Sequence, residues 1–257
     1  MRTVIPLAVF AIILLAAAPS HAQRGKTKTP TNNRNYVKDS FTAKDGISID
    51  YWVMTPEKIE QGRTYPLVLA LHGRGDSTVA ATALGSHALR KAFPCFVIAP
   101  FSTAEGNWAL PADFGKIKKN TKAIAMLPAA LEAMDAFMDS QPINRDRVYV
   151  TGHSMGGVGT FGALTLRPDT FAAAIPVAGG WNPKDAGKMK KVAMWVFHGD
   201  QDKAVPTRLS RNMVDAIRKA GGMPKYTEYK GVGHDSWTRT YSASETWNWL
   251  FKQKRKQ

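Results

Sequence analysis

The sequence predicts a single α/β domain with a mostly parallel central sheet and helices on both faces. Short, nearly continuous apolar runs alternate with helical patterns over most of the chain, without a linker or an internal repeat. Such runs are typical of parallel strands covered on both faces, because neither side of the strand meets water. A length of 257 residues is sufficient for one large domain with a substantial core.

The elements can be placed in order along the chain. A half-buried strand is predicted at 47–53, where apolar residues recur at every second position. Residues 102–120 are less regular, and they fit either a loop over the carboxyl edge of the sheet or a surface excursion. Buried strands are expected at 67–71, 96–99, 148–150, 172–177 and 192–197, helices at 80–93, 123–138, 156–166 and 208–220, then a strand at 225–229 and a helix at 243–251.

The first 22 residues have the pattern of a cleavable secretory signal. A short positive start precedes an apolar run at 4–18, and Ser20 and Ala22 supply the small residues expected at −3 and −1 of a cut after Ala22. The run is shorter than the roughly 20 residues that a spanning helix needs. We therefore expect a secreted or periplasmic protein with no transmembrane segment after cleavage. Residues 23–40 are expected to form a flexible basic lead-in, and residues 41–257 the folded domain.

The charge balance raises the question of an anionic partner. The chain has 35 Lys and Arg against 20 Asp and Glu, a formal net charge of +15. The basic residues are scattered, with groups at 24–28, 188–191 and 252–256, which indicates a solvated surface and not one nucleic-acid footprint. Export further disfavours nucleic acid, which leaves an acidic polysaccharide or an anionic envelope surface as candidates. The sequence gives no indication of oligomeric state.

The single cysteine limits the chemistry available to the protein. Cys95 has no second cysteine with which to form an internal disulfide, and cysteine-based zinc and iron–sulfur sites are excluded. Its position at the start of an apolar run favours a buried, unreactive thiol. The chain has no Gly-rich phosphate loop after a strand and no His, Asp and Glu cluster at metal-ligand spacing. We therefore expect neither a cofactor nor a metal.

A Gly-x-Ser-x-Gly motif follows one of the buried strands and precedes a helical pattern. The motif is Gly152-His153-Ser154-Met155-Gly156. A serine on a tight strand-to-helix turn projects its hydroxyl outward, and only very small residues two positions before and after it avoid collision. The start of the following helix also favours an anion at the same place. Between a strand and a helix, the motif is strong evidence for a nucleophilic serine, Ser154.

A serine hydroxyl needs a base, and one of the six histidines is best placed to provide it. His234 lies in a glycine-bounded loop after the last predicted strand, where an imidazole can reach a serine that follows a neighbouring strand. His72 and His198 each end a strand beside a glycine, where a structural role is more common. The orienting carboxylate is expected between the serine and the histidine in the chain. Asp200 and Asp202 both qualify, and the residues alone favour neither.

These motifs resemble the α/β-hydrolase superfamily. The matching segments are Leu71-His72-Gly73-Arg74-Gly75, the serine motif, His198-Gly199-Asp200-Gln201-Asp202 and Gly231-Val232-Gly233-His234, in the expected order over about three-quarters of the chain. The resemblance is greatest to secreted carboxylesterases of the dienelactone-hydrolase and polyhydroxybutyrate-depolymerase-like type, which include feruloyl esterases and predicted peptidases. It implies that 41–257 is a catalytic α/β-hydrolase domain, and that Asp202, the last residue of the His-Gly-x-x-Asp pattern, is the third catalytic residue.

The expected reaction is ester hydrolysis through an acyl-enzyme, with Ser154 as the nucleophile, His234 as the base and Asp202 as its orienting group. The backbone N–H of Met155 would be one oxyanion donor. By resemblance, the second is the N–H of Arg74. Feruloyl, acetyl-sugar, short-chain and polyester substrates all fit these motifs. Three tryptophans near strand ends are candidates for contacts with the substrate: Trp108, Trp181 and Trp237.

Two other functions fit part of the sequence. A prolyl-oligopeptidase-like peptidase would use the same three residues on an amide, but such enzymes usually carry a large additional domain, for which this chain has no room. A basic exported protein that binds anionic polymers on a hydrolase fold would explain the charge, but it would not need an intact Ser-His-Asp set.

Overall fold

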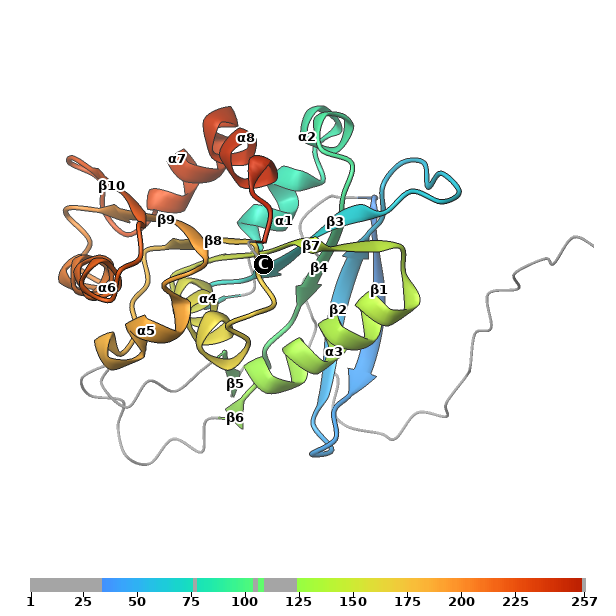
Figure 1. Ribbon diagram of the computed structural model, residues 1–257, viewed down its shortest axis with the longest axis horizontal. Coiled ribbons are helices and arrows are strands. Elements are labelled where there is room, and N and C mark those ends of the chain that lie inside the picture. The colour runs from blue at the N-terminus through green and yellow to red at the C-terminus, as the bar shows by residue number, and fades with distance from the viewer. Residues whose placement is uncertain (1–33, 76–77, 104–105, 109–123, 256–257) are drawn as a thin grey trace, which may run out of the picture.

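The computed structural model describes residues 34–75, 78–103, 106–108 and 124–255, and it confirms the predicted fold class. Its main sheet has eight strands in the order β1-β2-β4-β3-β7-β8-β9-β10 (Figure 1). The pairs from β4 to β10 are parallel, whereas β1–β2 and β2–β4 are antiparallel. The expected signal sequence, most of the lead-in and residues 109–123 of the irregular segment lie outside the described residues.

The described elements follow the predicted alternation closely. The strands are β1 (Tyr36–Thr42), β2 (Ser48–Met54), β3 (Tyr65–Leu71), β4 (Phe96–Pro100), β5 (Gly106–Asn107), β6 (Ile124–Ala125), β7 (Ile143–His153), β8 (Ala173–Val177), β9 (Ala193–Gly199) and β10 (Lys225–Tyr229). The helices are α1 (Val79–Leu84), α2 (His87–Ala92), α3 (Leu127–Ser140), α4 (Met155–Leu166), η1 (Pro183–Asp185), α5 (Ala186–Met189), α6 (Arg208–Lys219), α7 (Ser236–Ser242) and α8 (Ser244–Lys252).

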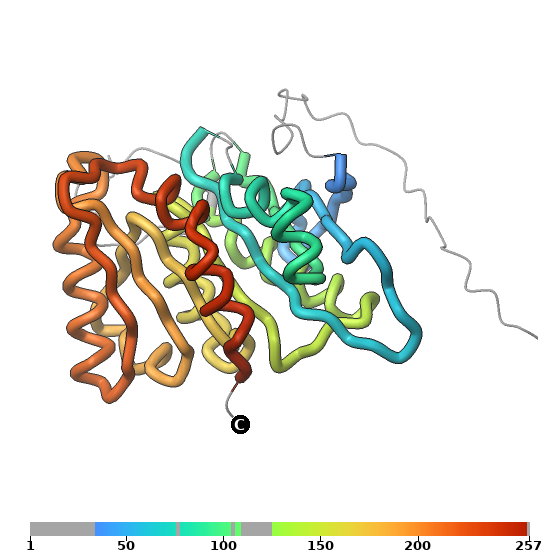
Figure 2. The backbone as a smooth tube through the Cα atoms, turned by 90° about the horizontal axis from the view of Figure 1, so that it is seen from above, coloured from blue at the N-terminus to red at the C-terminus, as the bar shows by residue number. Residues whose placement is uncertain are grey.

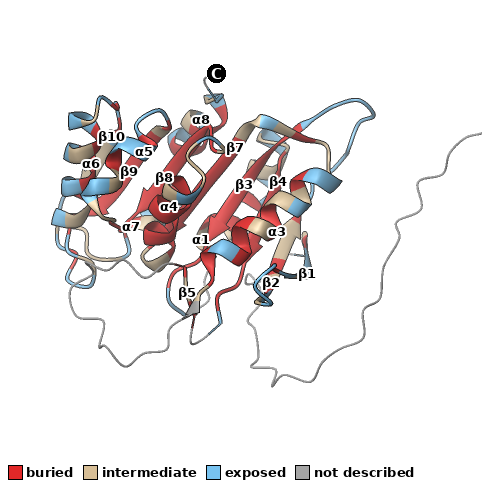
Figure 3. Ribbon diagram, turned by 60° about the horizontal axis from the view of Figure 1, so that its bottom comes forward, coloured by how far each residue is buried: buried red, intermediate tan, exposed pale blue. Residues whose placement is uncertain are grey.

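Helices cover both faces of the main sheet and divide the core into two layers (Figure 3). The side chains of β3 alternate between them: Leu67 and Leu69 pack in the layer under α3 and α4, while Val68 and Ala70 pack in the layer under α1 and α8. All seven residues of β3 are buried. Seen from above, α8 crosses the middle of the sheet with α1 and α2 beside it (Figure 2). This two-sided burial explains why the strand reads as one apolar run.

Two differences from the sequence prediction have a clear physical cause. The expected flexible lead-in reached residue 40, but β1 begins at Tyr36 and pairs antiparallel with β2. Tyr36 is buried and donates its hydroxyl to the carbonyl of Ala81, a contact distant in sequence that no local pattern reveals. The helix expected at 80–93 is two helices, because α1 ends at Gly85 and Ser86 begins α2 by accepting a hydrogen bond from the N–H of Leu89.

The parallel strands bring the predicted functional residues to one edge of the sheet. Ser154 follows β7, Asp202 follows β9 and His234 follows β10, so all three come after the carboxyl ends of parallel strands. Arg74 follows β3, the neighbour of β7. Within the described residues, no helix combines the length and the apolar character needed to cross a membrane.

Candidate active site

Ser154 occupies the tight turn between β7 and α4, in a strained backbone conformation. Its φ of 53° and ψ of −118° lie outside the regions common for residues with a side chain. The flanking glycines make the turn sterically feasible: a Cβ on Gly152 would lie 2.4 Å from the carbonyl oxygen of Gly156, and one on Gly156 would lie 2.1 Å from that of Leu71. The glycine spacing of the motif therefore reflects direct contact between the turn and β3.

Backbone hydrogen bonds hold the turn in place, and two backbone amides near Ser154 stand out among the described residues. The N–H of Ser154 donates to the carbonyl of Val177 at the end of β8, at 2.9 Å. Among the hydrogen bonds of the described residues, none uses the backbone N–H of Met155, the first residue of α4, or that of Arg74. The N-terminal end of a helix carries unsatisfied N–H groups and a partial positive charge, and both favour an anion near Ser154.

Ser154, His234 and Asp202 lie in one hydrogen-bonded line. The Nε2 atom of His234 lies 2.9 Å from the Oγ of Ser154, and its Nδ1 lies 2.7 Å from the Oδ2 of Asp202. Ser154 is half-buried, and the His234 side chain is 28% exposed, so both are within reach of a ligand. The Asp202 side chain has no exposed surface. The arrangement can move a proton from the hydroxyl to the imidazole while the buried carboxylate orients the ring.

Four donors surround the Asp202 carboxylate. Its Oδ1 accepts hydrogen bonds from the backbone N–H groups of Ala204 and Val205, both at 2.9 Å. Its Oδ2 faces the Nδ1 of His234 and the Nε2 of His198, the latter at 3.1 Å. The protein itself thus supplies hydrogen-bond partners to both oxygens of this buried carboxylate.

Asp200, the other candidate carboxylate, holds the histidine loop in place. Its Oδ1 accepts the N–H of Gly231 at 2.8 Å, and the N–H of the next residue, Gln201, donates to the carbonyl of Val232 at 2.9 Å. These two bonds tie the loop after β9 to the loop that carries His234. The structure thus brings Asp202, and not Asp200, to the imidazole. The sequence did not indicate the cross-loop bonds of Asp200, because they depend on the pairing of β9 with β10.

Trp237 lies between two imidazole rings. Its ring centroid is 5.0 Å from that of His234 in an edge-to-face arrangement, and 4.5 Å from that of His153. His153 is buried, its Nδ1 has no hydrogen-bond partner in the described part of the chain, and burial is the main reason that its pKa falls to about 3. His153 is therefore neutral near pH 7, and the Trp237 ring contacts the rings of both His153 and His234.

The other two candidate tryptophans have structural contacts. Trp108 is fully buried, and its indole N–H donates to the carbonyl of His72 at 2.8 Å, so it offers no exposed surface to a substrate. This burial argues against the predicted substrate contact of Trp108. Trp181 is half-buried, donates its indole N–H to Asp185 and lies over Gly162 in the middle of α4. Of the three, only Trp237 has a contact with the Ser-His-Asp line in the described residues.

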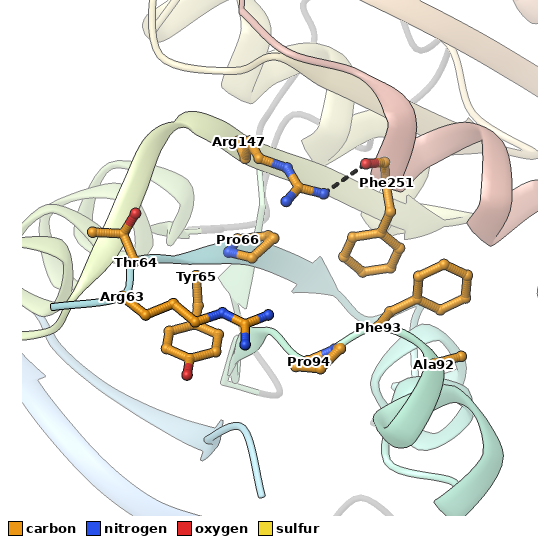
Figure 4. A pocket seen from close by; sticks show the side chains of 9 residues that line it. All are labelled: Arg63, Thr64, Tyr65, Pro66, Ala92, Phe93, Pro94, Arg147 and Phe251. Carbon is orange, nitrogen blue, oxygen red and sulfur yellow. Dashed lines mark hydrogen bonds between the residues drawn. The ribbon is translucent and has the colours of Figure 1, made fainter. Parts of the chain in front are cut away.

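A cavity lies at the edge of the sheet opposite Ser154. It encloses about 230 Å³ at the beginning of β3 and β4, and the guanidinium groups of Arg63 and Arg147 line it beside the stacked rings of Phe93 and Phe251 (Figure 4). No serine, cysteine or histidine is among its lining residues.

Within the described ranges, no group of three or more His, Cys, Asp or Glu side chains is arranged to hold a metal ion.

The fold and the arrangement of Ser154, His234 and Asp202 are those of an α/β-hydrolase. Residues 56–246 match the Phospholipase/Carboxylesterase family, and the chain belongs to this family of ester hydrolases. A solved structure of a thermostable esterase is 32% identical and superposes with a TM-score of 0.77, covering 87% of this chain and 64% of that one. The resemblance to carboxylesterases found in the sequence motifs is thus confirmed.

Two relatives of known sequence add to this result. Poly(3-hydroxyalkanoate) depolymerase C of Paucimonas lemoignei is 32% identical over 121 residues, which are 45% of this chain but 28% of the depolymerase. A probable carboxylesterase SOBER1-like of Arabidopsis thaliana is 26% identical over 205 residues, covering 70% of this chain and 76% of the relative. The match to the depolymerase therefore spans less than a third of that protein.

Proposed function

We propose that this protein is an exported serine carboxylesterase that hydrolyses ester bonds through Ser154, His234 and Asp202. The observation that carries the proposal is the continuous line from the Ser154 hydroxyl through both nitrogens of His234 to a fully buried carboxylate. Membership of a family of ester hydrolases supports the type of bond that is cleaved.

In the first half of the reaction, the Ser154 oxygen attacks the ester carbonyl carbon while the Nε2 of His234 takes the hydroxyl proton. The negative charge on the tetrahedral oxygen is stabilised by the backbone N–H groups of Met155 and Arg74, which have no other use among the described hydrogen bonds. The carbon–oxygen bond to the alcohol then breaks, His234 gives its proton to the departing oxygen, and the acyl group remains on Ser154.

In the second half, water takes the place of the alcohol. His234 removes a proton from the water as its oxygen attacks the acyl carbon, and a second tetrahedral intermediate forms with the same two backbone donors. Its collapse returns the proton from His234 to the Ser154 oxygen and releases the acid. Asp202 accepts the Nδ1 hydrogen of His234 throughout, so Nε2 remains free to accept and donate, and the imidazolium is stabilised when it forms.

The test of the reaction is the Ser154→Ala variant. We expect p-nitrophenyl acetate hydrolysis to fall by about 10⁶-fold, the loss seen when such a nucleophile is removed. Ser140→Ala, at an exposed serine at the end of α3, is the matched control and should retain full activity. A fluorophosphonate probe should label the unchanged protein and not Ser154→Ala. Full activity in the purified Ser154→Ala protein would contradict the proposal.

The substrate class requires a separate panel. We propose carboxylic esters of low polarity, including polyesters, because the depolymerase relative is named for a polyester. The panel comprises p-nitrophenyl esters of increasing chain length, methyl ferulate, acetylated xylan, an insoluble aliphatic polyester and a peptide p-nitroanilide. Release of soluble acid from the insoluble polyester would support a polymeric substrate. Cleavage of the p-nitroanilide alone would instead identify a peptidase.

Export is the second part of the proposal. It is supported by the apolar run at 4–18 and by the small residues Ser20 and Ala22. Expression of the full chain in a bacterial host, followed by fractionation, should place the protein in the periplasm or medium with Gln23 as its first residue. Retention in the cytoplasm with residues 1–22 still attached would contradict export without affecting the proposed reaction.

A further inference from the structure

A second histidine contacts the carboxylate that orients His234. His198, at the end of β9, lies with its Nε2 3.1 Å from the Oδ2 of Asp202 and 2.9 Å from the carbonyl oxygen of Val205. Neither the His198 nor the Asp202 side chain has exposed surface. The rings of His198 and His234 therefore contact the same buried carboxylate oxygen, Oδ2 of Asp202.

The neighbours of His198 determine where its hydrogen lies. Nε2 faces two acceptors, so this nitrogen carries the hydrogen. Burial lowers the pKa of His198 more than its contacts with Val205 and Asp202 raise it, which favours the neutral ring. Nδ1 of the neutral ring is then an acceptor, and the Oγ of Ser210 on α6 lies 2.7 Å from it. The same Oγ lies 2.9 Å from the carbonyl oxygen of Gly179, so the single hydroxyl hydrogen of Ser210 lies between two acceptors, Nδ1 and this carbonyl.

We infer that His198 is a positioning residue for Asp202, and that it donates from Nε2 to fix the orientation of the carboxylate oxygen that holds His234. This inference rests on the proposed function, because it concerns the same Ser-His-Asp reaction. Ser210 supports the arrangement by contacting Nδ1 and linking that side of the His198 ring to Gly179.

The inference has a structural and an electrostatic consequence. The two backbone N–H groups of Ala204 and Val205 hold only Oδ1, so without His198 the other oxygen, Oδ2, is held by His234 alone. The carboxylate is then freer to turn and to misalign the base. His198 also takes up part of the charge on Oδ2, so its loss leaves more charge opposite His234. The titratable groups that face His198 are Asp202, His234 and Glu228 of β10.

Three substitutions separate the roles of the two ring nitrogens. His198→Gln places an amide donor near the position of Nε2, His198→Asn places one near Nδ1 only, and His198→Leu removes both. We expect His198→Gln to keep kcat within about tenfold, while Asn and Leu lower kcat by about 100-fold, the cost of a small misplacement of a catalytic group. KM for p-nitrophenyl acetate should change by less than about threefold, because His198 does not contact the substrate in the proposed mechanism.

The pH dependence provides a readout that loss of packing alone would not change. The rising limb of kcat/KM against pH reports the ionisation of the free enzyme's base. In His198→Leu this limb should move to higher pH, because the additional charge on Oδ2 favours the protonated form of His234.

Ser210→Ala should lower kcat several-fold, whereas Ser140→Ala, at an exposed serine, should not change kcat. Far-ultraviolet circular dichroism and thermal melting establish that each variant is folded before its kinetics are compared.

The outcomes distinguish this inference from the proposed function. If the unchanged protein hydrolyses the ester and Ser154→Ala does not, the proposed function holds. The inference is then overturned when His198→Leu keeps kcat within twofold and the limb does not move, or when Gln and Asn lose equal activity. If His198→Leu does not fold, the comparison of Gln with Asn decides. If the unchanged protein has no esterase activity, the proposed function itself fails.

Discussion

Gly199 lies directly against the loop that carries His234, so close to Gly233 that a side chain cannot fit between them. A Cβ on Gly199 would be 2.2 Å from the carbonyl oxygen of Gly233 and 2.3 Å from that of Val232. Gly199 is the last residue of β9 and leads into the loop that carries Asp202, and Gly233 directly precedes His234. The distance between the carboxylate and the imidazole is thus fixed by backbone contact as well as by the hydrogen bond between them.

This contact predicts that Gly199→Ala separates the two loops and impairs the reaction. Contacts below 3.0 Å force the backbone to shift, and a displacement of about 1 Å in a catalytic group costs about 100-fold in rate. We expect kcat on p-nitrophenyl acetate to fall by about that factor, with a smaller change in KM. Gly233→Ala is the matched control, because a Cβ there meets no atom within 4 Å. Equal kcat values for the two folded variants would disprove this role of Gly199.

The serine turn predicts a loss of stability, and a nearby helix supplies the control. Gly156→Ala would place a Cβ 2.1 Å from the Leu71 carbonyl oxygen at the carboxyl end of β3, so we expect unfolding in urea to show a loss of about 3 kcal/mol or more. At Gly187 in α5 a Cβ meets nothing within 4 Å, and Ala there should stabilise the protein by up to about 1 kcal/mol. Similar unfolding curves for Gly156→Ala and the unchanged protein would contradict the steric explanation of the motif.

The sequence was sufficient to predict features that depend on local patterns. The strand 225–229 has the predicted bounds, and Ser154, His234 and Asp202 meet as expected because parallel strands end at one edge. Contacts between distant segments were not predictable in the same way. Pairing of β1 with β2 depends on where the chain returns, and the approach of His198 to Asp202 depends on the turn after β9. Two carboxylates two residues apart gave no local signal of which one would face the imidazole.

Trp237 is predicted to act through His234 as well as through any substrate contact. The edge-to-face contact between their rings is worth about 0.5–1.5 kcal/mol. We therefore expect Trp237→Ala to lower kcat by about three- to tenfold for acetyl and aryl esters alike. Trp237→Phe keeps an aromatic ring and should retain most of the kcat of the unchanged protein. Trp181→Ala, which has no contact with His234 among the described ring contacts, is the comparison. An unchanged KM for aryl esters in both alanine variants would argue against a contact of Trp181 and Trp237 with the substrate.

Cys95 is predicted to be inert in the folded protein. It is fully buried, and burial raises the pKa of its thiol to about 12, although Arg147 and Arg90 oppose this effect. Because the thiolate is the reactive form, Ellman's reagent at pH 8 should not react with the native protein within minutes and should titrate one thiol after unfolding in guanidinium. Rapid reaction in the native state would show that the thiol reaches solvent.

The buried ring of His153 predicts a loss of stability in mild acid. Its pKa is about 3 in the folded protein against an ordinary value of 6.5, so between these pH values the unfolded chain binds a proton that the folded chain does not. The contribution to stability is therefore complete above pH 6.5 and declines as the pH falls, reaching a loss of about 2 kcal/mol at pH 5. His198, whose pKa is also lowered by burial, adds a loss of the same sign.

Urea unfolding at pH 7 and pH 5 measures this effect. His153→Gln removes the titrating group, so the difference in unfolding free energy between the two pH values should be smaller by about 2 kcal/mol than in the unchanged protein. His87→Gln, at an exposed position in α2, should leave the difference unchanged. An equal loss of stability on acidification in His153→Gln and in the unchanged protein would contradict this prediction. It would show that the folded state accommodates a charged His153 in spite of the burial of its ring beside Trp237.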